Sequence, residues 1–260
     1  MIIDTNVYVG QWPFRRLPGA ALPELIAKLQ SHGVTEAWAG SFEGILHEDV
    51  AGVNERLAAA CRGSKNSSGS AFLIPFGTVN PALPDWRDDL RRCHEEHKMP
   101  GIRLHPGYHG YTLDDPRFAE LLLLATERSM AVQVVLNMED GRTQHPLAAV
   151  KEVNTLPLLP LIFKTKGMRL IIQNRKIEPS GKLLGRLSYA GEVYFDFAML
   201  EGVGAIPKLL KEIPSDRLLF GSHHPFFYFE SALLKVKEAG LSEPQEKAIL
   251  AENAGLILEP

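Results

Sequence analysis

The stretch RLLFGSHHPFF, Arg217 to Phe227, joins an apolar, strand-like run to a polar ending of glycine, serine and two adjacent histidines. Similar short apolar runs recur along the chain, and each is followed by a segment with helical periodicity. In the segment Ala21 to Gly33, for example, Leu22, Leu25 and Leu29 fall on one helical face. The strand-like runs cover residues 1–9, 34–40, 71–79, 101–106, 131–137, 168–173, 192–200 and 217–222.

Eight strand–helix pairs in a chain of 260 residues predict a single α/β domain, residues 1–260, folded as a (β/α)8 TIM barrel. Two helices are expected between the fifth and sixth strands, over residues 145–154 and 156–164. A doubly wound open sheet is the alternative, but the chain has no G-x-G-x-x-G after the first run and no G-x-x-x-x-G-K-[ST]. We therefore expect the chemistry at the carboxyl ends of the strands, where the connecting loops of a barrel meet.

Composition and charge narrow the classes of partner. Hydrophobic residues make up 45% of the chain, charged residues 23%, and the net charge is −3, so neither nucleic acid nor a membrane is expected as a partner. The sequence shows no secretory signal and no membrane-spanning run, and we expect a cytoplasmic protein. Cys61 and Cys93 lack C-x-x-C spacing, so neither a disulfide nor a thiolate metal site is expected.

Four motifs, taken in order, resemble the amidohydrolase-related family of the metal-dependent hydrolase superfamily. IIDTNVY at 2–8 is similar to the family's first-strand I-D-x-H-x-H, and GIRLHP at 101–106 is similar to its fourth-strand G-[IV]-[KR]-L-H-P. RLLFGSHHP at 217–225 is similar to the eighth-strand R-[IL]-L-F-G-[ST]-D-x-P, and EKAILAENAGLIL at 246–258 to the terminal helix. The resemblance covers nearly the whole chain and implies a distorted (β/α)8 barrel, related to decarboxylases, hydratases and lactonases.

The resemblance also implies a divalent metal, held by histidines that end strands one, five and six and by an aspartate that ends strand eight. In this chain the corresponding positions hold Asn6, Tyr8, Asn137, Gln173 or Asn174, and His223. Neutral amides and a phenol are poor zinc ligands, so we expect no metal and no other cofactor. The alternative is a different metal site built from the remaining histidines, which are His105, His109, His145, His223 and His224.

His223 is the leading catalytic candidate, because the resemblance places it where the family's proton-handling aspartate lies. An imidazole whose ordinary pKa is near 6.5 can transfer a proton at neutral pH. His105 is expected to face the same pocket, with Tyr8 and Asn6 donating hydrogen bonds to developing oxyanion charge. The alternative for His223 is structural: it fills the emptied metal site by hydrogen bonding to Asn6 or Asn137. Strand parity predicts that His223 points into the pocket and His224 away from it.

Substrate contacts are expected from polar side chains around the barrel mouth. Arg103 or Arg175 would hold a substrate carboxylate through two parallel hydrogen bonds, whereas the alternative for Arg103 is a buried ion pair with Asp4 or Glu139. The further candidate contacts are Asn137, Glu139, Gln173 and His224. For His224 the alternative is a loop residue that caps the following segment.

Two functions are consistent with these residues. The first, which we favour, is a metal-independent hydrolase or decarboxylase that acts on a small carboxylated compound, since some lactonases that resemble this family act without metal. The second is a catalytically inactive barrel that serves as a binding or regulatory module. An open cavity shared by His223 and His105 would support the enzyme, whereas a collapsed or aromatic-filled centre would support the binding module.

Two aromatic segments bear on assembly. Trp12 and Phe14 lie in the first loop, and Phe226 to Phe229 follow the eighth strand. These side chains exceed what the outer layer of a barrel needs, and contiguous exposed apolar patches mark interfaces. We therefore expect a homodimer. The alternative for Trp12 and Phe14 is closure of the first loop over the barrel mouth, and the alternative for the segment from Pro225 to Glu230 is helix packing.

Overall fold

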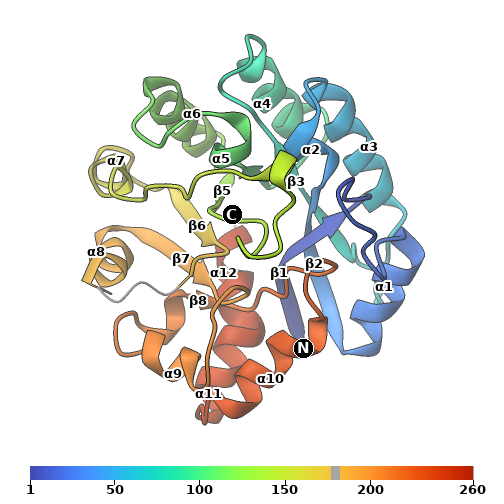
Figure 1. Ribbon diagram of the computed structural model, residues 1–260, viewed down its shortest axis with the longest axis vertical. Coiled ribbons are helices and arrows are strands. Elements are labelled where there is room, and N and C mark those ends of the chain that lie inside the picture. Colours follow the sequence, from blue (N-terminus) through green and yellow to red (C-terminus); the bar gives the residue numbers. More distant parts are fainter. Residues whose placement is uncertain (177–181, 260) are drawn as a thin grey trace.

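The computed structural model describes residues 1–176 and 182–259 and shows eight parallel strands that form one barrel surrounded by helices (Figure 1). The strands pair in sequence order, and backbone hydrogen bonds from Thr5 N to Phe220 O and from Tyr8 N to His224 O, both 3.0 Å, join the last strand to the first. The predicted (β/α)8 barrel is therefore confirmed. The strands are β1 (Ile2–Val9), β2 (Val34–Ser41), β3 (Leu73–Thr78), β4 (Gly101–Leu104), β5 (Ala131–Val135), β6 (Arg169–Gln173), β7 (Glu192–Asp196) and β8 (Leu218–Leu219).

The helices alternate with the strands, and their starting residues explain several of the boundaries. The Asp115 side chain accepts a hydrogen bond from Arg117 N at the start of α6, and Pro116 occupies the first helical position, where no N–H donor is needed. The α-helices are α1 (Leu22–Ser31), α2 (Glu43–Leu46), α3 (Val50–Arg62), α4 (Trp86–Glu95), α5 (Pro106–His109), α6 (Pro116–Glu127), α7 (Leu158–Lys164), α8 (Lys182–Ala190), α9 (Ala205–Leu209), α10 (Phe229–Glu238), α11 (Glu243–Lys247) and α12 (Asn253–Leu258). The described residues also contain three short helical segments: η1 (Pro146–Ala148), η2 (Ser215–Arg217) and the π-helical η3 (Ala248–Glu252).

The amino-terminal half of the barrel interior is an apolar core. Trp38 of β2 stacks on Phe76 of β3 with ring centroids 4.9 Å apart, and Ile171 and Leu219 pack in the same cluster. Ile257 of α12 belongs to this cluster too, so the terminal helix covers this end of the barrel. The opposite end, where the strands finish, carries a concentration of buried polar side chains, and that end holds the candidate site.

One predicted helix is wrong. Residues 145–154 form only the short η1, and the chain from Ala149 to Thr155 has no helix or strand. Pro146 fixes the start of the turn, but the β-branched Val150 and Val153 follow it, and they lose side-chain freedom in a helix. The segment crosses the carboxyl end of the barrel as an extended loop (Figure 1).

Two further features of the sequence can be placed. Cys61 and Cys93 are free thiols buried in the layer between the strands and the helices. Within the described part of the chain, no helix has the length and apolar character needed to cross a membrane.

Candidate functional site

A buried polar layer lies inside the barrel, below the strand ends, and Arg103 of β4 is its centre. The Arg103 side chain is 0% exposed. Its Nε donates to Gln133 Oε1 at 2.6 Å, and its terminal nitrogens donate to Val7 O at 2.7 Å, Trp38 O at 2.9 Å and Thr5 O at 3.2 Å. The guanidinium also lies over the ring of Tyr8, 4.6 Å from its centroid. Arg103 thus ties four strands together.

These contacts correct both expectations for Arg103. Its guanidinium is committed to protein acceptors, so it is not presented to a substrate carboxylate. The alternative, a buried ion pair with Asp4 or Glu139, is not formed either, because Asp4 accepts hydrogen bonds from Ser222 and Glu139 lies 3.4 Å from Arg15. Burial without a close carboxylate lowers the pKa of Arg103 from its ordinary value.

A second polar network fills the positions where the resemblance expected metal ligands. Asn6 Nδ2 donates to Asn174 Oδ1 at 2.8 Å and to Asp196 Oδ2 at 2.6 Å. His223 Nε2 donates to Met138 O at 2.7 Å, which leaves Nδ1 as the acceptor facing Asn174 Nδ2 at 3.3 Å. As predicted, His223 points to the barrel centre. The amides and the imidazole satisfy one another without any cation.

The backbone at two of these positions is in the left-handed region. Asn174 has φ 57° and His223 has φ 56°, and each ends or follows a strand at the carboxyl end of the barrel. Asparagine and histidine are both enriched among the non-glycine residues that adopt this conformation, although it costs about 1–3 kcal/mol at each position. The turn places the His223 ring over the barrel axis, against Asn6 and Asn174.

Burial sets the protonation states of the network. Desolvation lowers the pKa of His223 to about 3 and raises that of Asp196 to about 6. Desolvation also lowers the pKa of His105 well below its ordinary value and raises that of Tyr8. At neutral pH both imidazoles and the phenol are therefore uncharged, and a pKa so far below neutral makes His223 a weak proton acceptor.

His105, which directly follows β4, lies beside Tyr8. The Tyr8 hydroxyl and His105 Nε2 are 2.9 Å apart and share a hydrogen bond. Nδ1 of His105 has no hydrogen-bond partner among the described residues. The His223 ring meets the Tyr8 ring edge-on at 5.6 Å, so the three predicted side chains do come together around Tyr8.

An aromatic cover, formed by Trp12, Phe42 and Phe226, closes this group from solvent. Phe42 stacks on Tyr8 at 4.9 Å, Phe226 stacks on His223 at 5.1 Å, and Trp12 contacts both Phe42 and Phe226. Trp12 is 3% exposed and Phe226 7% exposed. Trp12 and Phe226 are therefore not part of an exposed patch as expected, whereas Tyr228 of the same aromatic run is 78% exposed. The alternative for the first loop, closure over the barrel mouth, agrees with the position of Trp12.

The remaining predicted contacts are dispersed. Gln173 donates to Thr5 O at 2.8 Å and belongs to the polar layer of Arg103, and Asn137 donates to Asn174 O at 3.2 Å. Glu139 pairs with Arg15 of the first loop. His224 turns away from the centre, as predicted, and its ring lies against Gly19. The structure therefore does not bring His224 together with the other site residues.

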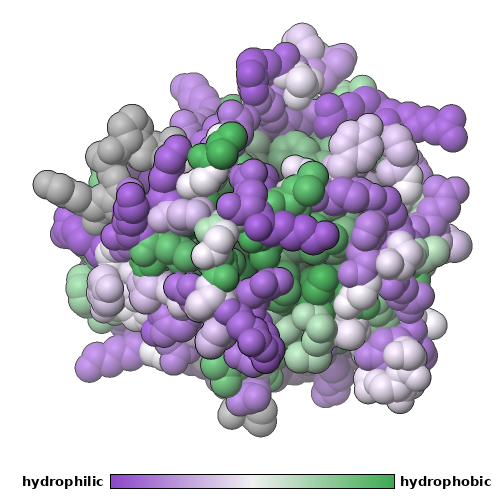
Figure 2. Space-filling view, turned by 90° about the horizontal axis from the view of Figure 1, so that it is seen from below, coloured by the Kyte–Doolittle hydropathy of each residue, from purple (hydrophilic) through white to green (hydrophobic). Residues whose placement is uncertain are grey.

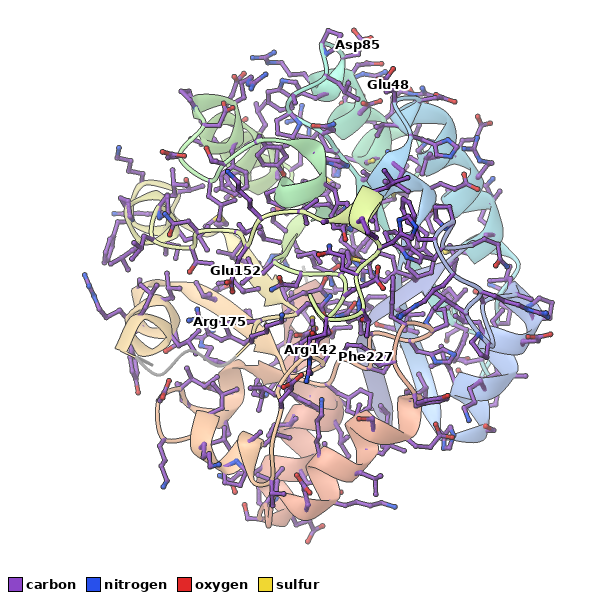
Figure 3. The ribbon with its side chains drawn as sticks, viewed as in Figure 1. Glu48, Asp85, Arg142, Glu152, Arg175 and Phe227 are labelled. Atoms are coloured by element: carbon purple, nitrogen blue, oxygen red, sulfur yellow. The ribbon has the colours of Figure 1, made fainter. Side chains whose placement is uncertain are left out.

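Two arginines lie over the strand ends. In the view down the barrel, Arg142 and Arg175 project near its centre together with Phe227 (Figure 3). Arg142 pairs with Asp140 within its own loop. Arg175 is 9% exposed and directly follows Asn174. Both guanidinium groups therefore lie at the mouth, next to the buried network.

The donor set does not fit the divalent metal that the resemblance implies. Among residues 1–176 and 182–259, no three side chains of the histidine, cysteine or carboxylate kinds lie close enough to hold a metal ion. The positions of the expected ligands instead present amide groups already bonded to one another. No chemical step through a metal can be derived from these residues.

Several residues of the site were not singled out from the sequence. Asp196 and Asn174 are central to the network, but the sequence offered Asn174 only as an alternative to Gln173. Met138 contributes a backbone oxygen, which no side-chain pattern reveals. Phe226 was assigned to a surface. Only Asp196, a carboxylate that ends an apolar strand, carried a signal that could have identified it.

Comparisons with known proteins agree with this fold. The family model described as amidohydrolase matches residues 14–258. Similar solved structures include 2,6-dihydroxybenzoate decarboxylase complexed with 2,6-dihydroxybenzoate, with a TM-score of 0.73, 13% identity and coverage of 99% of both chains. A 5-carboxyvanillate decarboxylase from Novosphingobium aromaticivorans, with bound manganese, has a TM-score of 0.74, 15% identity and coverage of 99% of this chain and 97% of that one.

An uncharacterized TIM-barrel protein from Bordetella bronchiseptica is similar as well, with a TM-score of 0.72, 13% identity and coverage of 99% of this chain and 98% of that one. A search of curated proteins finds no match. At these identities the solved structures establish a shared fold, and chemistry has to be argued from the site.

Proposed function

Because the chain belongs to the amidohydrolase family, we propose that it is a metal-independent member that binds a small carboxylated compound and does not convert it at the barrel centre. The observation that carries this proposal is the closed centre. Asn6, Tyr8 and His223 are 0% exposed and His105 is 1% exposed. A catalytic group has to come within hydrogen-bond reach of a substrate atom, and here those places are taken by Phe226, Met138 and Asn174.

The protonation states support binding without turnover. A general base works best with a pKa near the operating pH, whereas the pKa of His223 is about 3. Asp196, with a pKa of about 6, accepts hydrogen bonds from Asn6 and from the backbone of Asn174. These contacts make Asp196 part of the fixed network and leave its oxygens turned to the protein.

The class of ligand is suggested by charge and by similarity. Arg15, Arg142 and Arg175 come from three separate loops at the carboxyl end of the barrel, and guanidinium groups recognise carboxylates. Two of the three similar solved structures named above are decarboxylases of carboxylated aromatic compounds. Both observations favour a carboxylated ligand over a neutral one.

The test is a panel of aromatic and aliphatic carboxylates and lactones, with and without added manganese or zinc. Thermal denaturation reports binding, because a ligand that binds only the folded state raises the melting temperature. We expect at least one carboxylate to raise it and no compound to be hydrolysed or decarboxylated. Metal-dependent product formation that is lost in the His223→Gln variant would refute the proposal.

A second candidate is a metal-independent hydrolase or decarboxylase, and the contact between Tyr8 and His105 favours it. The two groups are 2.9 Å apart, and His105 Nδ1 lacks a partner among the described residues, so a substrate group could complete its hydrogen bonding once the aromatic cover opens. Turnover that needs no metal and falls at least 100-fold in Tyr8→Phe and His105→Gln would select this candidate.

Assembly and location remain proposals. Trp12 and Phe226 are buried, so they cannot form the dimer interface that the sequence suggested. Other apolar side chains are exposed, including Leu234 of α10 at 62% and Tyr228 at 78%. Helices α9 to α11 lie along the lower edge of Figure 1, and the view from below shows hydrophobic side chains at the centre of this face with hydrophilic ones around them (Figure 2). Light scattering at micromolar concentration distinguishes dimer from monomer, and cell fractionation tests the proposed cytoplasmic location.

A further inference from the structure

A cleft of about 550 Å³ lies beside the aromatic cover, outside the barrel centre. One wall comes from the loop after β1, with Arg15, Arg16 and Gly19, and the other comes from the loop after β8, with Phe227 and Tyr228. Pockets for small organic ligands commonly have volumes of about 300–1,000 Å³. The cleft therefore has room for a small molecule, whereas the barrel centre is filled by side chains.

Cationic side chains outnumber acidic ones in the lining of the cleft. Arg15, Arg16 and Lys28 line the cleft together with one acid, Glu24. Lys28 is paired with Glu230, and Arg15 lies 3.4 Å from Glu139. Arg16 is exposed and forms no ion pair within the described ranges, 1–176 and 182–259. One guanidinium is thus available to an anion, and two further cations lie around it.

Its walls are aromatic. Tyr228 is 78% exposed, and Phe227 is half-buried next to it. Phe226 lies beneath, and the Arg15 guanidinium sits over the Phe226 ring, 5.1 Å from the centroid. Exposed aromatic rings beside an unpaired arginine provide a face on which a flat ring can stack while its acid group meets the guanidinium.

The inner wall also has an unused polar atom. His224 is 5% exposed and its Nδ1 lies 3.3 Å from Phe227 O, so that nitrogen donates to the carbonyl. Nε2, on the side of Gly19, has no partner among the described residues. Buried polar atoms in native structures are normally satisfied, and a polar group of a ligand or a water in the cleft would satisfy this one.

We propose that this cleft, and not the barrel centre, binds the ligand, and that the ligand is an aromatic carboxylate whose acid group pairs with Arg16 and whose ring stacks on Phe227 and Tyr228. The inference rests on the proposed function for the presence of a carboxylated ligand. It adds the location of the binding site and the aromatic character of the ligand. Both are argued from the segments QWPFRR, 11–16, and HHPFFYFE, 223–230.

The experiment uses 2-naphthoate as the probe and 2-naphthalenemethanol as its uncharged counterpart, with binding measured by calorimetry. The variants are Arg16→Ala and Tyr228→Ala, and Arg62→Ala removes another exposed arginine, on α3, as the control. We expect Arg16→Ala to raise the Kd for 2-naphthoate at least tenfold, as loss of a charge-assisted hydrogen bond does. Tyr228→Ala should raise the Kd severalfold, and Arg62→Ala should leave it within twofold.

The outcomes separate the cleft from the proposed function. If 2-naphthoate binds wild type and Arg16→Ala equally, the cleft is refuted, while binding of a carboxylate still agrees with the proposed function. If the carboxylate panel shows binding only for aliphatic acids, the aromatic assignment is refuted and the proposed function stands. If 2-naphthoate binds no better than the alcohol, Arg16 has no part in recognition and the inference fails. If 2-naphthoate binds in the cleft but is also converted by the enzyme, the proposed function fails and the cleft stands.

Discussion

Replacing His223 with glutamine should weaken the pH dependence of stability by a calculable amount. In the folded protein, burial holds the pKa of His223 at about 3, whereas its ordinary value, which applies to the unfolded chain, is 6.5. Between these values the unfolded chain binds a proton that the folded protein does not. His223 therefore leaves stability unaffected above pH 6.5 and reduces it progressively as the pH falls towards 3.

The size of the effect follows from the two pKa values. The slope is about 1.4 kcal/mol per pH unit below pH 6.5, so His223 alone lowers the free energy of unfolding by about 2 kcal/mol between pH 7 and pH 5. Asp4, with a pKa of about 7, and Asp196, with a pKa of about 6, act in the opposite direction. Both carboxyls have a raised pKa in the folded protein, so they add stability as the pH falls. The wild-type curve is a sum of these contributions, and only a comparison with the variant isolates His223.

The assay is urea denaturation followed by circular dichroism, at pH 7 and pH 5, for wild type and His223→Gln. The loss of stability between the two pH values should be about 2 kcal/mol smaller in the variant, whatever the substitution costs at pH 7. His47→Gln is the control, since His47 is exposed and its imidazole is hydrated in both states. Equal pH dependence of wild type and His223→Gln, within about 0.5 kcal/mol of extrapolation error, would mean that His223 is not a desolvated, neutral imidazole.

Three further outcomes are expected. Arg103→Met should lower the free energy of unfolding by about 3–5 kcal/mol in urea denaturation, because buried carbonyl oxygens lose their donor; a loss below about 1 kcal/mol would contradict the contacts. Gly40→Ala should cost about 1–3 kcal/mol, because its Cβ would lie 2.7 Å from Arg103 Nη1, whereas Gly63→Ala, with nothing within 4 Å, should not. Protein purified without added metal should contain well under one equivalent of zinc, manganese or iron by elemental analysis; a stoichiometric amount would overturn the assignment of the amide network.

The fold was predictable because its signal is repeated along the chain. An apolar run followed by a helical segment recurs eight times, and misreading one helix, at residues 145–154, leaves the barrel intact. The direction of His223 was predictable for a similar reason, since strand parity and the position of the GSHHP motif agree. Both inferences depend on local pattern, which the sequence carries directly.

The closure of the site was not predictable in this way. The sequence around Trp12 and Phe226 is equally consistent with an exposed patch and with a cover over Tyr8. Contacts between residues more than 200 positions apart, such as that between Trp12 and Phe226, decide between the two. The sequence also does not show that the Arg103 side chain donates its hydrogen bonds within the protein, because three of its four acceptors are backbone oxygens. A sequence pattern predicts which side chains point to the barrel centre. It does not predict which of their hydrogen-bond donors and acceptors are left free for a ligand.

The amide and imidazole network has a physical reason to hold a neutral residue at position 223. Asp196 is already buried there, with desolvation raising its pKa to about 6, and Asp4 is buried nearby on β1 with a pKa of about 7. A third carboxylate in place of His223 would be a further desolvated charge of the same sign, and without a cation it would have to remain protonated. A neutral imidazole instead donates to Met138 O and accepts from Asn174. With amides and a phenol at the ends of the first, fifth and sixth strands, the histidine that follows β8 satisfies the hydrogen bonds of the centre without requiring a metal.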